Sequence, residues 1–421
     1  MNDVWIAGGI FLITYAVIIS ERIHRTVAAL IGGLLMVLLG IVDQRLAFES
    51  IDWNVIFLLA GMMVIANILS ETGLFEWTAI QAVRLGRRNP FRIMVLLSMF
   101  TAFGSALLDN VTVVVLIAPV TLYVATNLHI SPVPFLIAEV MASNIGGAAT
   151  LIGDPPNILI GSAANIDFLT FAANMTPPTL VMLVLFIPLS YFVFAKDLRV
   201  TPGERPRTSM LETGELIKDP TLLFQSLVVI GLVLLGFSFH SQLHLETATV
   251  AMSGATLLLL WTRKDPHHIL RDVEWTTLFF FIGLFIMVEA VVEVGIIGAV
   301  ARWALDLTGG DLTVTALLLL WLSGIASGIV DNIPYTATMI PLIKDLGEGG
   351  LDTGPLWWAL ALGADYGGNF TLVGASANVV VASLAERSGL KISFIRFFKY
   401  GLPITFVSLL VATAYVWLRY L

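Results

Sequence analysis

Two stretches of the chain combine glycines, amides, hydroxyls and carboxylates inside otherwise apolar sequence. They occupy residues 142–157 and 363–378, and the first contains Pro155-Pro156. Proline removes a backbone donor and clashes with the preceding turn, so a helix cannot run straight through this pair. Inside a bilayer, unpaired backbone is tolerated only where it is buried in protein or lines a wet cavity. The pattern therefore predicts broken membrane helices, the elements that hold the cargo in many transporters.

Two further polar places interrupt apolar hairpins, at Asp109-Asn110 and at Asp331-Asn332. A charge at the centre of a bilayer costs about 3 kcal/mol on insertion scales, so carboxylates placed there indicate a function. We expect protons to be carried by Asp109, Asp154, Asp331 and Asp365. We expect substrate or ions to be bound by Asn110, Thr112, Asn144, Thr150, Asn157, Asn332, Thr336, Asn369, Thr371, Ser376 and Asn378. The alternative role of these groups is to cap the half-helices and to bond to one another.

The chain repeats itself at a nearly constant offset of 221 or 222 residues. Pairs that match are Trp53 and Trp275, Asp109 and Asp331, Asn110 and Asn332, Thr150 and Thr371, Gly153 and Gly374, and Asn157 and Asn378. Self-similarity of this kind indicates an internal duplication. The Asp154-Pro155-Pro156 triplet is replaced by Ala375-Ser376-Ala377, so the two copies have diverged chemically.

Composition favours a membrane protein. The 421 residues are 57% hydrophobic and 12% charged, about half the charge of a usual soluble domain. Apolar runs long enough to span roughly 30 Å of hydrocarbon recur throughout. The absence of cysteine excludes disulfides, thiolate metal sites and thiol catalysis. No span carries the His-Glu-x-x-His pattern of an intramembrane metalloenzyme, so we expect no enzyme. We also expect no metal or other cofactor and no nucleic-acid partner.

We predict an all-α polytopic fold of two inverted repeats, with about ten transmembrane helices, two re-entrant hairpins and two broken helices. The first repeat covers residues 1–195, with spans near 4–20, 26–42, 54–70 and 177–195, a hairpin at 92–127 and a broken helix at 132–166. Residues 196–220 form a cytoplasmic linker. The second repeat covers residues 221–421, with spans near 222–239, 246–262, 275–293 and 399–420, a hairpin at 314–343 and a broken helix at 355–386.

The distribution of positive charge supports this topology. All but four of the 22 lysines and arginines fall on one side of it, and the four are Arg45, Arg302, Lys344 and Arg419. The positive-inside rule makes the rich side cytoplasmic and places both termini outside the cytoplasmic membrane. A hairpin that crossed the membrane fully would dissolve the bias, which is why we predict re-entrant hairpins.

The charge of the polar places bears on the cargo. No lysine or arginine falls within their sequences, so four aspartates without a fixed counter-charge suit a proton or cation and a neutral or weakly charged passenger. Glu139, Glu289 and Glu293 fall nearer the predicted ends of helices and are expected to be interfacial.

The polar segments resemble the ion transporter superfamily. The residues that carry the likeness are Leu108-Asp109-Asn110-Val111-Thr112, Asn144 to Asn157 with its Gly153-Asp154-Pro155-Pro156-Asn157 ending, and Val330-Asp331-Asn332-Ile333-Pro334. Within the superfamily they are most similar to the branch of ArsB-type arsenite permeases, NhaD-type sodium/proton antiporters and the P protein. The resemblance implies ten spans with two re-entrant hairpins, a homodimer and elevator-like movement. The Ser-Asn-Thr signature of the sodium-coupled carboxylate carriers is absent from both hairpin tips.

These observations predict a secondary transporter that exports arsenite or antimonite in exchange for protons. Undissociated arsenite is a small neutral trihydroxide that Asn, Thr and Asp can hold through hydrogen bonds. Sodium/proton antiport by the same carboxylates is the alternative, and a sodium-coupled carboxylate carrier is a further one. A channel, which would show unsaturable flux, also stays open.

Overall fold

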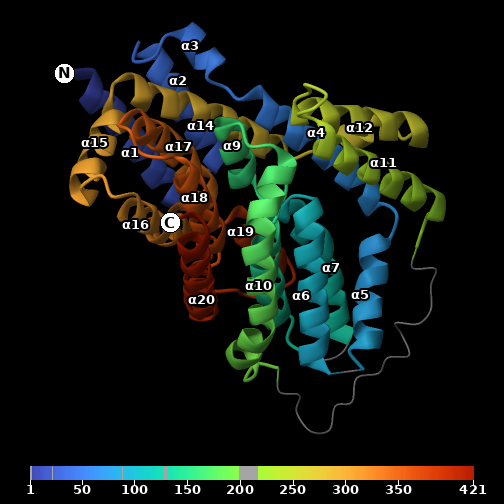
Figure 1. Ribbon diagram of the computed structural model, residues 1–421. Coiled ribbons are helices and arrows are strands. Elements are labelled where there is room, and N and C mark those ends of the chain that lie inside the picture. The colour runs from blue at the N-terminus through green and yellow to red at the C-terminus, as the bar shows by residue number, and fades with distance from the viewer. Residues whose placement is uncertain (1, 21, 88, 128–129, 199–216) are drawn as a thin grey trace.

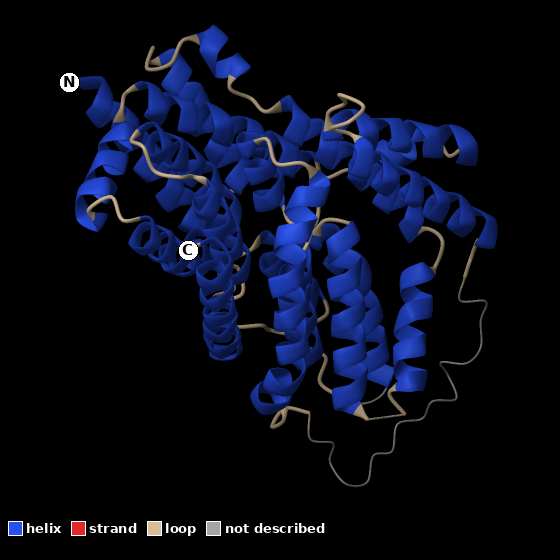
Figure 2. Ribbon diagram, in the orientation of Figure 1, coloured by secondary structure: helices blue, strands red, loops and turns tan. Residues whose placement is uncertain are grey.

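The computed structural model describes residues 2–20, 22–87, 89–127, 130–198 and 217–421, which form helices and no strand (Figures 1 and 2). The first ten helices are α1 (Asn2–Ser20), α2 (Arg25–Leu38), α3 (Gln44–Glu49), α4 (Trp53–Ser70), α5 (Leu74–Leu85), α6 (Pro90–Leu107), α7 (Asn110–Asn127), α8 (Val133–Gly147), α9 (Pro155–Ala164) and α10 (Phe168–Phe194). The next ten are α11 (Pro220–Phe239), α12 (Thr247–Thr262), α13 (Pro266–Arg271), α14 (Trp275–Glu293), α15 (Ile296–Thr308), α16 (Leu312–Val330), α17 (Asn332–Glu348), α18 (Gly354–Gly367), α19 (Ser376–Arg387) and α20 (Phe394–Tyr420).

Each of the first ten helices has a counterpart ten places later. The short helices α3 and α13 have six residues each, and the long helices α10 and α20 have 27 each. Helices α6–α7 and α16–α17 occupy the two predicted hairpins, and α8–α9 and α18–α19 occupy the two predicted broken helices. Most of the predicted linker, residues 199–216, lies outside the described residues.

Among the described residues, eight helices are long and apolar enough to cross a membrane, which confirms the predicted all-α polytopic class. Helices α2 and α12, predicted as full spans, have only 14 and 16 residues, or about 21 and 24 Å at 1.5 Å per residue. Helix α11 shows why the outer helices need lipid. Its side chains Phe224, Leu227 and Leu235 are 64%, 49% and 57% exposed, a large apolar area for water to cover.

Helices α2 and α14 pack together, as do their counterparts α12 and α4. The first pair begins at the same end, because the Thr26 hydroxyl donates to the Thr276 carbonyl over 2.6 Å. The second pair likewise begins together, since the Thr247 hydroxyl donates to the Asn54 side-chain oxygen over 3.3 Å. These four helices form the upper layer of Figure 1, and α5, α6, α7 and α10 extend from it. We call this layer, with α1 and α11, the scaffold layer.

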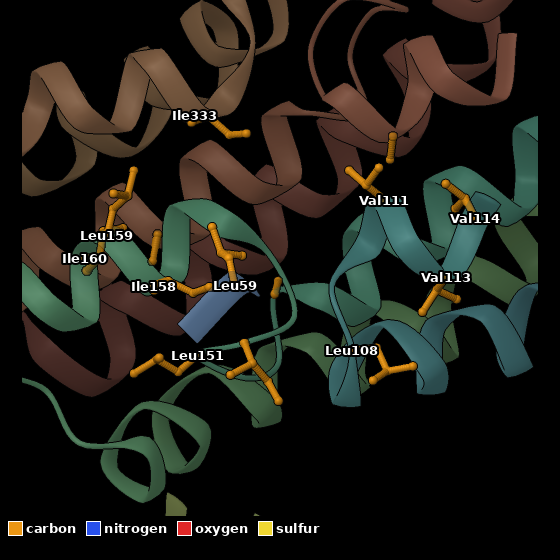
Figure 3. Packing of buried hydrophobic residues seen from close by; sticks show 14 of the residues in the cluster. Leu59, Leu108, Val111, Val113, Val114, Leu151, Ile158, Leu159, Ile160 and Ile333 are labelled. Atoms are coloured by element: carbon orange, nitrogen blue, oxygen red, sulfur yellow. The ribbon is translucent and has the colours of Figure 1, made fainter. Parts of the chain in front are cut away.

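The break between α8 and α9 is buried except at Thr150, which is partly exposed. Every residue of α8 is buried, and Leu108 and Val111 of the first hairpin belong to the same buried cluster as Leu151 of the break and Ile158 of α9 (Figure 3). Helix α8 packs against the hairpin arm α6 so closely that a side chain on Gly146 would overlap the Ala102 carbonyl. A glycine is therefore required at Gly146 by backbone contact.

Gly146→Ala is expected to destabilise the protein by about 1–3 kcal/mol or more, because overpacking forces backbone to move. Thermal unfolding in detergent, followed by tryptophan fluorescence, measures the loss. Gly231→Ala is the matched control, because this α11 glycine has nothing within 4 Å of an added methyl group. Equal unfolding temperatures for the two variants would contradict the close contact between Gly146 and the Ala102 carbonyl.

Candidate functional site

Each hairpin tip is bonded to the break of its own half. The amide of Asn110 donates to the Gly153 carbonyl over 3.1 Å, and the amide of Asn332 donates to the Gly374 carbonyl over 3.0 Å. The four polar places that the sequence singled out are thereby drawn into two matching pairs of tip and break.

Two asparagines close the break loops in the same way. The side-chain amide of Asn157 donates to the carbonyls of Gly147 and Thr150 over 3.2 and 3.1 Å. Asn378 makes the same two bonds to the matching carbonyls of the second break, over 2.7 and 3.0 Å. Because both N–H groups are used, each side-chain oxygen is left to face outward from its loop as an acceptor.

The predicted threonines divide by role. The hydroxyls of Thr150 and Thr371 donate to backbone carbonyls of the hairpin arms α6 and α16. The hydroxyl and amide of Thr112 donate to Asp109, which caps α7. These contacts match the capping alternative. Thr336 differs, because its buried hydroxyl has no hydrogen-bond partner among the described residues.

Amide side chains join the two halves at the centre. Asn144 lies near the end of α8, and its amide donates to the side-chain oxygens of Asn369 and Asn378, each over 3.0 Å. Its own oxygen accepts from Asn110 over 3.3 Å. Asn369 in turn donates to the Met141 carbonyl of α8 over 3.1 Å. Residues more than 200 positions apart thus form one buried network.

Asp154 is the carboxylate on which both hairpin tips converge. It accepts from the side chain of Asn110 over 2.7 Å and from that of Asn332 over 3.3 Å. It is 1% exposed, and Asp109, Asp331 and Asp365 are within electrostatic range of it. Like charges this close in a medium of low dielectric constant repel, so the centre favours an added positive charge.

Asp365 is buried without a donor. Neither of its carboxylate oxygens has a hydrogen-bond partner within the described part of the chain, although Asn157 is a polar neighbour. The free side-chain oxygens of Asn157 and Asn110 are also buried and unpartnered. The centre is therefore lined by acceptors that lack donors. Such a lining suits a proton, a hard monovalent cation or a ligand rich in hydroxyl groups.

Divalent metal chemistry has less support. The described residues contain no group of three His, Asp or Glu side chains placed to share a metal ion.

The expectation that all four aspartates lack a fixed counter-charge is wrong for Asp331. Arg25, in the first turn of α2, forms an ion pair with Asp331 at 3.4 Å and donates to Ser376. It is separated from them by more than 300 residues of sequence, so only the fold brings them together. Asp331 is consequently the one central aspartate with a fixed counter-charge among the described residues.

The interfacial placement of Glu139 is also wrong. Its side chain is 2% exposed and accepts from the Thr121 hydroxyl of α7 over 2.7 Å. The reason is that α8 is enclosed by protein along its whole length, so distance from a helix end says nothing about contact with water. Glu289 of α14 is partly buried.

The arrangement of scaffold layer, hairpins and breaks can be compared with known proteins. Residues 15–363 match the family described as "Citrate transporter" (CitMHS). The chain belongs to this family.

The relatives of this chain include proteins named as a transporter and as a membrane protein. It is 46% identical to an uncharacterized transporter of Mycobacterium tuberculosis, over 99% of this chain and 98% of that one. It is 46% identical to a 46 kDa membrane protein of Mycobacterium leprae, over 99% of both chains. It is 36% identical to the human P protein, over 99% of this chain but 60% of that protein.

A solved structure shares the fold. The YdaH transporter of Alcanivorax borkumensis aligns with a TM-score of 0.58 over 91% of this chain and 87% of that one, at 15% identity. The predicted membership of the ion transporter superfamily is confirmed, and the protein is a multi-pass membrane transporter.

Proposed function

We propose that the protein is a secondary transporter whose coupling ion, a proton or sodium, binds between the two breaks at Asp154 and Asp365. The observation that carries the proposal is the buried carboxylate of Asp365, which faces acceptors and has no donor. Coupling needs a group whose occupancy changes during the cycle, and an unsatisfied buried acceptor is such a group.

Comparison of the two halves sharpens this argument. Asp365 and Asn144 occupy matching positions, as do Asn157 and Asn378. The amide of Asn144 donates to Asn378, whereas the corresponding pair of Asp365 and Asn157 has no donated hydrogen bond. A proton on Asp365 supplies the missing donor, and a sodium ion would satisfy the same oxygens by coordination.

The other two central aspartates are less suited to coupling. Asp331 is paired with Arg25. Asp109 caps α7 and accepts a hydrogen bond from the amide of Thr112. We therefore narrow the four predicted proton carriers to Asp154 and Asp365.

For the passenger we propose arsenite or antimonite, exported in exchange for protons. A neutral trihydroxide offers three O–H donors, and the acceptors of Asp365, Asn157 and Asn110 are free to receive them. Sodium/proton antiport is favoured by the same lining and is the second candidate. A carboxylate such as citrate, suggested by the family's description, is the third, because its negative charge would face carboxylates and amide oxygens.

The membrane arrangement completes the proposal. We infer inverted repeats in the cytoplasmic membrane, with both termini outside, from the repeated helix order and the one-sided positive charge. Re-entrant hairpins, elevator-like movement and a homodimer are what the superfamily implies for this chain.

Purified protein in liposomes under an imposed pH gradient tests the passenger. We expect saturable arsenite flux accompanied by proton movement in the opposite direction, read by an internal pH dye. Sodium-dependent proton movement without arsenite flux would establish the antiporter instead, and citrate flux would establish the carboxylate carrier. Unsaturable flux without proton movement would indicate a channel.

A further inference from the structure

Arg25 connects the scaffold layer to the second hairpin. One nitrogen of its guanidinium contacts both Asp331 at the hairpin tip and Ser376 at the start of α19. The guanidinium carbon lies 5.3 Å from the ring centre of Phe280 on α14, a cation–π distance. The side chain is 26% exposed, so water screens this pair only in part.

A second scaffold contact reinforces the first. The hydroxyl of Tyr15 on α1 donates to the Pro334 carbonyl over 2.8 Å and lies 2.7 Å from the Thr338 hydroxyl, both on α17. The first hairpin has no such chemistry at the matching positions, where Phe237 replaces Tyr15 and Thr247 replaces Arg25. Polar attachment to the scaffold layer at these positions is thus specific to the second hairpin.

The attached tip is strained. Asp331 has φ of 93° and ψ of 134°, a conformation that side chains other than glycine rarely adopt. Such a residue costs about 1–3 kcal/mol and persists only when its surroundings hold it in place. The Ile333 amide, Ser376 and Arg25 provide that hold, so release of Arg25 would favour movement of the tip.

The scaffold layer offers Arg25 another partner. Glu274, the residue before α14, lies at the same end of the α2–α14 pair as Arg25, because Thr26 donates to the Thr276 carbonyl over 2.6 Å. Arg25 and Asp109 both act electrostatically on it. Burial raises the pKa of Glu274, as does Asp109, while the Thr277 hydroxyl and Arg25 act in the opposite direction. A partly buried carboxylate of this kind is stabilised by pairing with a cation.

We propose that Arg25 is a positioning residue that latches the second hairpin to the scaffold layer, and that the hairpin is released when the guanidinium transfers from Asp331 to Glu274. This inference rests on the proposed transport function, because the transfer frees the polar centre to move relative to α2 and α14. The inference goes beyond the proposed function by naming the Arg25–Asp331 ion pair as the contact that must break before the polar centre moves.

A cavity beside the latch provides a readout that does not depend on transport. Its volume is about 480 Å³, and Arg25, Asp331, Ser376 and Val330 are among its lining residues. The chain has no cysteine, so Val330→Cys creates a single reactive thiol at the hairpin tip. The rate at which a water-soluble maleimide labels this thiol reports how firmly the tip is held.

We expect Arg25→Gln to accelerate labelling at least fivefold. Asp331→Asn should also accelerate it, because asparagine can still cap α17 but cannot form the ion pair. The two substitutions together should accelerate labelling no more than Arg25→Gln alone, since Arg25→Gln already removes the ion pair. Arg25→Lys should give an intermediate rate, because a single ammonium cannot reproduce the fork of the guanidinium. Glu274→Gln should slow labelling under an imposed ion gradient by removing the second partner.

Thr249→Cys on α12 is the control, because this exposed site lies away from the latch and should label at one rate in every background. Labelling of Val330→Cys within twofold of the parent rate in either Arg25→Gln or Asp331→Asn would overturn the latch. Additive acceleration in the double variant would overturn it as well. Loss of proton coupling in the liposome assay would contradict the proposed function without altering these rates.

Discussion

Asp365→Asn is expected to reduce coupled transport to the level of empty liposomes while the protein becomes more stable. Asparagine supplies a permanent N–H donor where Asp365 has none, and so reproduces the Asn144–Asn378 hydrogen bond on the other half. We expect the free energy of unfolding to rise by about 1 kcal/mol, the net value of one hydrogen bond. The same change removes the group that gains and loses the coupling ion. Flux in liposomes and thermal unfolding in detergent measure the two effects.

Asp154→Asn provides the comparison. Asp154 receives hydrogen bonds on both oxygens, from Asn110 and Asn332, and asparagine offers only one side-chain oxygen. We therefore expect loss of transport together with destabilisation of about 1–3 kcal/mol, because one buried donor is left unpaired. Full proton-coupled flux in Asp365→Asn would exclude this residue as a coupling group. A lower free energy of unfolding in Asp365→Asn would contradict the absence of a hydrogen-bond donor to Asp365.

The convergence of tips and breaks could be predicted because its causes are local. Prolines and glycines stop helices at fixed positions. Because the chain repeats at 221 or 222 residues, Asn110 and Asn332 are expected to occupy equivalent positions in the two halves. The structure adds the detail that many of these polar groups bond to one another. Asn157, Thr150 and Thr371 hold loops, so a polar residue at a break is not by itself a ligand.

Arg25 could not be predicted from the polar segments because it belongs to none of them. Its signal was available only as a difference between the halves, since Thr247 stands at the matching position. A charge in the first turn of an apolar helix is typical of a residue at the membrane interface. In the folded chain, Arg25 instead forms an ion pair with Asp331. Glu139 was misplaced for a related reason, because helix α8 contacts protein on every side.

Asn144→Ala is expected to lower the free energy of unfolding by about 2–6 kcal/mol. Its amide is a donor to Asn369 and Asn378, and each buried acceptor left unpaired costs about 1–3 kcal/mol. Thermal unfolding in detergent measures the loss. Asn67→Ala is the matched control, because the amide nitrogen of Asn67 is buried without a hydrogen-bond partner and its removal should be nearly neutral.

The double variant Asn144→Ala/Asn378→Ala tests whether the two halves are joined through this bond. Each single substitution breaks the Asn144–Asn378 hydrogen bond, and the double variant loses this bond only once, so the losses should be less than additive. Strict additivity would mean that the amides are not coupled across the centre. The Asn144–Asn378 bond would then not couple the two breaks, and Asp365 would have no matching bond to complete. The stability of the amide network and the coupling role of Asp365 therefore depend on the same contact between α8 and the second break.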